Sequence, residues 1–132
     1  MKLRRLSAAL PEDWEQAAPF LQAALVKGHG ESDWLLEDIY NAALADRVML
    51  WGLVDDEHLI GAGATCVLDY PRRRVLEILV LGTEPHCGLE PFLEQIKQVA
   101  RGLGATCLQG TGRPGWARKL GGRERRVFEV DL

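Results

Sequence analysis

Apolar side chains recur with a helical period near the start of the chain. They fall at three- and four-residue intervals that share one helix face, at Trp14, Ala17, Ala18, Leu21 and Leu25. Pro19 removes a backbone donor within this pattern, so the sequence predicts a kinked helix or two short helices, the second starting near Pro19. Gly28 and Gly30 end the segment. Ser32 then suits the N-cap of a second helix that reaches Ala43.

The middle of the chain is typical of strands. Short apolar segments at Val48–Val54, His58–Leu68 and Val75–Leu81 are separated by two polar turns, which predicts an antiparallel meander. The third segment is almost continuously apolar, as a central strand buried on both faces would be. Gly61 and Gly63 lower the strand propensity of the second segment and allow a bulge there.

A helical period returns over residues 91–103, and a short strand is predicted over Ala105–Gln109. A strand–helix–strand unit implies a parallel pair with a right-handed crossover. A short helix over Trp116–Leu120 and a last strand over Val127–Val130 complete the order α-α-β-β-β-α-β-α-β. The sequence therefore predicts one α/β domain spanning residues 1–132, with a mixed sheet and helices on both faces.

Composition narrows the class of protein. The chain has 132 residues and a formal net charge of −3, and no apolar run approaches the about 20 residues of a membrane span. An acidic turn follows the basic N-terminus, so we expect no secretory signal. Three cysteines without a CxxC motif predict free thiols in a reducing cytoplasm. Because no two histidines have ligand spacing, we also expect no metal.

Charge is distributed unevenly along the chain. Residues 11–57 hold eleven acidic and two basic side chains, whereas residues 101–132 hold seven basic and three acidic ones. A basic stripe can hold an anion such as phosphate, or it can be a solvated surface that pairs loosely with the acidic helices. Nucleic acid is an unfavourable partner, because the whole protein is acidic and the basic segment lacks interleaved aromatic residues.

Several side chains could carry chemistry. Glu77 lies within an apolar strand, where burial would raise the pKa of a carboxyl and suit it to general-base work, unless strand alternation faces it outward. Cys87 lies in a loop beside His86, although adjacent side chains usually point apart. Trp116 could stack on a ligand, with Arg113 and Arg118 holding an anion nearby. Alternatively, Trp116 fills the edge of the core and the two arginines are solvated.

The predicted order and the Leu76–Gly82 strand, which leads through a glycine loop into a long helix, resemble the GCN5-related N-acetyltransferase (GNAT) family. The resemblance implies that the loop and helix N-terminus bind the pyrophosphate of acetyl-CoA or another acyl-CoA. It also implies that the pantetheine arm lies between this strand and the next, and that Glu77 is the general base, acting through water. The cofactor site it implies comprises Leu81, Gly82, Cys87, Gly88, Leu89, Arg113, Trp116 and Arg118.

The chain departs from the family pattern at three positions. With Gly88 as the first loop glycine, Pro85 replaces the cation and Glu90 replaces a small residue. Ala117 takes the place of the Tyr that protonates the leaving thiolate. These departures predict a transferase with degenerate motifs. The alternative is a non-catalytic module that binds a protein partner.

A closer resemblance is to small phage-encoded GNAT-like proteins. It is carried by Gly112–Leu120, by Trp51-Gly52 and by Gly61-Ala62. This resemblance implies a phage setting, in the host cytoplasm or the virion, with a phage structural protein or a host protein as partner. A homo-oligomer is a further alternative.

Overall fold

A five-stranded mixed sheet forms the centre of the computed structural model, which describes residues 1–27, 33–111 and 115–132. Its strands lie in sequence order, and each of the first three is antiparallel to the next. The last two strands are parallel. The strands are β1 (Lys2–Leu6), β2 (Met49–Asp55), β3 (His58–Tyr70), β4 (Arg73–Thr83) and β5 (Cys107–Gly110).

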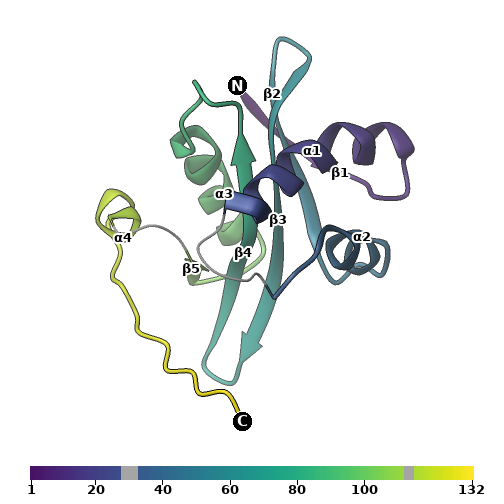
Figure 1. The fold of residues 1–132 in the computed structure, drawn as a ribbon. Coiled ribbons are helices and arrows are strands. Elements are labelled where there is room, and N and C mark those ends of the chain that lie inside the picture. Colours follow the sequence, from purple (N-terminus) through teal and green to yellow (C-terminus); the bar gives the residue numbers. More distant parts are fainter. Residues whose placement is uncertain (28–32, 112–114) are drawn as a thin grey trace.

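Helices cover both faces of this sheet, as Figure 1 shows. On one face α1 (Pro11–Lys27) and α2 (Leu36–Leu44) bury Leu21 and Ile39 in a core cluster with Leu50 of β2. On the other face α3 (Glu90–Gly102) buries Phe92 and Ile96 in a second cluster. A short helix, α4 (Trp116–Lys119), packs at the edge of that second cluster. The predicted α/β class, the meander and the parallel pair are confirmed.

Two glycines of the sheet allow the helices to pack close to its strands, because they have no side chain. A Cβ on Gly63 would lie 2.7 Å from Cζ of Phe92, so the absent side chain lets α3 approach β3. A Cβ on Gly82 would lie 2.5 Å from the carbonyl oxygen of Phe20, so α1 rests directly on the end of β4. The structure therefore gives Gly82 a packing role against α1.

A bulge in β4 changes the direction of its side chains. Ala64 pairs with Val80 and Thr65 with Ile78, which leaves Leu79 as the extra residue. Leu79 and Val80 consequently both pack with the α1 and α2 cluster, whereas Ile78 and Leu81 pack with the α3 cluster. A second bulge lies in β3 itself, where Leu53 of β2 pairs with Gly61 and Val54 pairs with Leu59, which leaves Ile60 as the extra residue. This bulge adjoins Gly61, as the sequence analysis predicted.

The two ends of the chain differ from the prediction. Residues 2–6 form β1, an edge strand that the sequence analysis missed, because a short strand carrying Lys2, Arg4 and Arg5 lacks a strong apolar pattern. The predicted last strand over Val127–Val130 is wrong: these residues belong to no strand, and Val127 and Phe128 are 90% and 91% exposed. Their apolar character provides strand propensity, but no neighbouring strand pairs with them.

The helix boundaries also needed correction. A single helix runs through Pro19, whose exposed position leaves the buried face intact, so the alternative of two short helices is wrong. The second helix begins at Leu36, and the N–H of Leu35 donates to Asp38 Oδ2 at 2.8 Å. The predicted N-cap, Ser32, lies outside the described residues.

Candidate functional site

The neighbouring strands β4 and β5 part within the sheet. They pair over four positions only, from Val75 with Cys107 to Ile78 with Gly110. β4 then continues to Thr83, and among the described residues no strand pairs with its β5-side edge beyond Ile78. The backbone groups of this edge are available to another hydrogen-bonding partner. The strands separate five residues before the end of β4.

Four of the predicted cofactor-site residues pack on the α3 face of the sheet. Leu81, Cys87, Leu89 and Trp116 all pack, partly buried, against the α3 cluster. They come from β4, from the loop before α3 and from α4. All four therefore belong to the apolar layer beneath α3, called the apolar patch below, as does Leu108 of β5.

The loop between β4 and α3 is a compact turn. The N–H of Cys87 donates to the Glu84 carbonyl at 2.9 Å, and Thr83 Oγ1 donates to the Cys87 carbonyl at 2.8 Å. The N–H of Glu84 donates to the Ile60 carbonyl at 2.9 Å, which ties the loop to β3. Gly88 is exposed and follows directly.

A carboxylate already occupies the first turn of α3. The Glu90 side chain accepts a hydrogen bond from its own backbone N–H, which lowers the pKa of its carboxyl, with Lys119 contributing further. Glu90 Oε2 also lies where a Cβ on Gly88 would stand. Lys119 Nζ lies 3.5 Å from Glu90 Oε1, so α4 reaches across to the start of α3. The sequence showed Glu90 as a departure from the family pattern, but not this contact.

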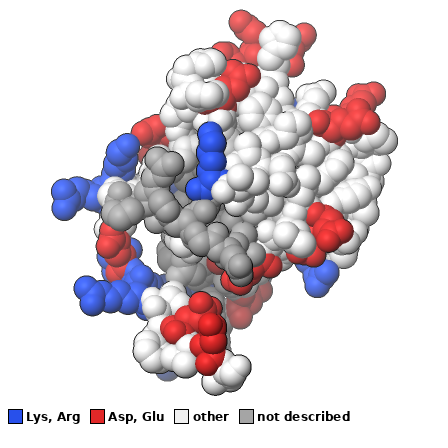
Figure 2. Space-filling view, viewed as in Figure 1, with Lys and Arg blue, Asp and Glu red and all other residues white. Residues whose placement is uncertain are grey.

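The remaining predicted residues of the anion site are dispersed or not described. Arg118 is exposed, and Arg113 lies outside the described residues. Trp116 fills the edge of the core, and Lys119 Nζ lies 5.0 Å from its ring centroid. In Figure 2 basic side chains gather along the side of the molecule that carries α4 and the C-terminal tail, in line with the uneven charge of the sequence.

Glu77 lies on the opposite face of β4 from this apolar patch. It pairs in register with Cys66 of β3 and Gln109 of β5, one residue before the last paired position of β4 and β5. The Cys66 thiol donates to Glu77 Oε2 at 3.8 Å. Burial, followed by the Glu77 charge and this hydrogen bond, raises the pKa of Cys66 to about 11. Glu77 is half-buried, so a water molecule can reach it at the base of the divergence.

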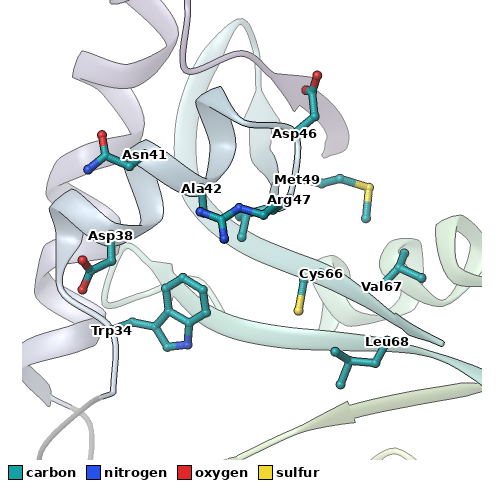
Figure 3. A pocket seen from close by; sticks show the side chains of 11 residues that line it. Trp34, Asp38, Asn41, Ala42, Asp46, Arg47, Met49, Cys66, Val67 and Leu68 are labelled. Atoms are coloured by element: carbon teal, nitrogen blue, oxygen red, sulfur yellow. The ribbon is translucent and has the colours of Figure 1, made fainter. Parts of the chain in front are cut away.

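A pocket opens on the same face as Cys66. It encloses about 790 Å³ between the start and end of α2 and the later part of β3. Figure 3 shows Trp34 and Cys66 on opposite sides of it, with Asp38 beside Trp34. Arg47 and Leu68 also line it. Because Cys66 contacts both this space and Glu77, a molecule in the pocket lies one side chain away from the carboxylate.

Solved structures share this architecture. A probable acetyltransferase has a TM-score of 0.75 at 14% identity, with 100% of this chain and 96% of that chain covered. A predicted acetyltransferase from Clostridium acetobutylicum, solved with acetyl-CoA, has a TM-score of 0.75 at 16% identity, covering 99% and 96%. A ribosomal-protein-alanine N-acetyltransferase from Brucella melitensis biovar Abortus 2308 has a TM-score of 0.72 at 13% identity, covering 100% and 99%.

No protein-family model and no curated protein sequence matches the chain. The structural similarity shows the fold: the chain has the mixed α/β architecture of GNAT acetyltransferases. Within the described residues no helix is long and apolar enough to cross a membrane.

The Cys66–Glu77 contact makes a prediction about thiol reactivity. With the pKa of Cys66 raised from 9.0 to about 11, its thiolate fraction at pH 8 is lowered roughly 100-fold relative to an unperturbed thiol. We expect iodoacetamide at pH 8, followed by peptide mass spectrometry, to label Cys66 last of the three cysteines. Glu77→Gln removes the charge and should speed Cys66 labelling while leaving Cys107 unchanged. Equal labelling of Cys66 in both proteins would contradict the contact.

Proposed function

We propose that this chain is an acyl-CoA-dependent N-acyltransferase, with degenerate motifs at the phosphate loop. The observation that supports it best is the early divergence of β4 from β5, which leaves one edge of β4 without a strand partner beside the start of α3. A thin, amide-bearing ligand is the chemistry that such an edge suits, since amides pair with backbone groups as a strand does. The pantetheine arm of coenzyme A has this character.

The proposed cofactor follows the apolar patch towards the start of α3. Leu81 and Leu89 offer apolar contact for the arm, and the loop around Gly88 leads its phosphates to the first turn of the helix. Glu90 opposes phosphate there, because like charges about 4 Å apart repel by about 1 kcal/mol in water. Lys119 beside Glu90 offsets part of this repulsion. The degenerate loop is therefore proposed to weaken binding of the cofactor.

The acyl acceptor is proposed to bind on the other face of β4. The pocket lined by Asp38, Trp34 and Cys66 is separated from Glu77 by the Cys66 side chain. An amine nitrogen attacks the thioester carbonyl carbon and the C–S bond breaks. The proton of the amine passes through water to the Glu77 carboxylate. Coenzyme A leaves as a thiol that takes its proton from solvent, because Ala117 stands where the family has Tyr.

A second candidate function is a non-catalytic module that binds a protein partner. The exposed C-terminal tail favours it, because Val127, Phe128 and Val130 present apolar surface that the rest of the chain leaves uncovered. The phage setting, with a phage structural or host protein as partner in the cytoplasm or virion, belongs with this candidate and stays a prediction. Turnover of acetyl-CoA with an amine would favour the enzyme over this module.

Calorimetric titration with acetyl-CoA tests the proposed cofactor site. We expect saturable binding to the wild-type chain, and Glu90→Gln should tighten it by about fivefold because one repulsion of about 1 kcal/mol is removed. Glu94→Gln is the matched control: Glu94 is exposed on the same helix, pairs with Lys97, and should leave the affinity unchanged. No heat at millimolar acetyl-CoA for either protein would contradict the proposal.

A kinetic comparison tests the role of Glu77. Wild type is assayed for release of the CoA thiol from acetyl-CoA with a panel of alkylamines and polyamines. We expect Glu77→Gln to lower kcat about 100-fold or more while KM for acetyl-CoA stays the same. Glu94→Gln again serves as the control. An equal kcat in Glu77→Gln and wild type would show that Glu77 is not the base, and no turnover by wild type with any amine would leave the binding module as the better account.

A further inference from the structure

Three potential metal ligands converge in the loop between β4 and α3. One donor atom from each of Glu84, His86 and Cys87 lies within 4.8 Å of the other two. His86 Nε2 and Glu84 Oε2 are already 3.3 Å apart. Among the described residues, no other group of three or more histidine, cysteine and acidic side chains brings its donor atoms this close together. The donor atoms of His86 and Cys87 can approach one another because these residues lie in a turn, where the alternation of side chains along a strand does not apply.

The backbone of the loop holds these side chains in place. The Cys87 N–H donates to the Glu84 carbonyl, which closes the turn and brings the first and last ligand residues together. Thr83 Oγ1 holds the Cys87 carbonyl from the strand side. Cys87 itself packs partly against the α3 cluster, whereas the His86 side chain is 79% exposed. One ligand is therefore anchored in the core and the others face solvent, so an ion can enter without unfolding the loop.

We propose that Glu84, His86 and Cys87 bind a Zn²⁺-class divalent ion, with water or a ligand oxygen in the fourth position. A thiolate and an imidazole favour zinc and similar transition ions over Mg²⁺ or Ca²⁺. Zinc binds sulfur at about 2.3 Å and nitrogen or oxygen at about 2.0–2.2 Å, so donors in a tetrahedral site lie about 3.5 Å apart. The Glu84–His86 pair has nearly this spacing, and a small side-chain rotation brings in Cys87.

The position of this site gives the ion a role in the loop. The turn carries the Glu84 carboxylate, and Glu90 lies a few residues further on at the start of α3. A divalent ion held by the Glu84 carboxylate, the Cys87 thiolate and a neutral His86 imidazole neutralises the negative charge of the turn, close to the position where the family has a cation and this chain has Pro85. This consequence rests on the proposed cofactor site, whereas metal binding itself does not.

Titration of the full, tag-free, reduced chain with Co²⁺ alone tests the site. Cobalt replaces zinc in tetrahedral sites, and a thiolate ligand gives it an intense charge-transfer absorption in the near ultraviolet. We expect this band to saturate at one Co²⁺ per chain and to disappear when Zn²⁺ is added. Cys87→Ser should abolish the band, and His86→Gln should weaken Co²⁺ binding about tenfold or more.

Matched variants distinguish this site from other binding. Cys107→Ser and Cys66→Ser remove the other two thiols and should keep the band, and circular dichroism checks that each variant is folded. Absence of the band in the folded wild type at saturating Co²⁺, or its persistence in Cys87→Ser, would overturn the proposal. The titration contains no coenzyme A, so its outcome is independent of whether the chain binds acetyl-CoA.

Discussion

The brief parallel pairing of β4 and β5 is the constraint on which the rest of the site depends. Four paired positions hold the strands together at their beginning, and β4 then runs on alone on that side to Thr83. Because α3 begins after the following loop, the free edge of β4 and the first turn of α3 lie near the same end of the sheet. Glu77 lies where the divergence starts, on the opposite face from the apolar patch. One feature of strand pairing thus positions both halves of the proposed reaction.

Electrostatics at the start of α3 sets this chain apart from a simple phosphate-binding helix. The backbone N–H of Glu90 already donates a hydrogen bond to the Glu90 carboxylate, and Lys119 of α4 forms an ion pair with the same carboxylate. An incoming phosphate therefore competes with an internal anion. Such an arrangement favours a weakly bound cofactor, or a site whose charge is adjusted by a cation in the preceding loop. The Lys119–Glu90 ion pair also links α4 to α3 across the mouth of the proposed cofactor site.

The elements with strong periodicity could be predicted from the sequence, and those that depend on partners could not. The apolar face of α3, with Phe92 and Ile96, and the central strand β4 have patterns that burial alone explains. The edge strand β1 was missed because only Leu3 and Leu6 of its residues face the core. The tail strand was predicted because its apolar residues have strand propensity, but propensity does not supply a neighbouring strand, and these residues are exposed.

The candidate site was predictable to a similar extent. The resemblance indicates Leu81, Cys87, Leu89 and Trp116 as cofactor-site residues, and all four pack on the α3 face of the sheet. The contact between Glu77 and Cys66 depends on the register of β3 and β4, which the bulge at Leu79 shifts by one residue. The convergence of His86 and Cys87 depends on a turn, where the alternation of neighbouring side chains does not apply.

Hydrogen exchange with and without acetyl-CoA tests the central claim most directly, because it reports on the backbone edge that the divergence leaves free. The account predicts slower amide exchange in the presence of acetyl-CoA at residues 79–83 of β4 and in the first turn of α3. It also predicts unchanged exchange in the paired part of β4. Protection that appears only elsewhere in the chain, or none at saturating acetyl-CoA, would contradict it.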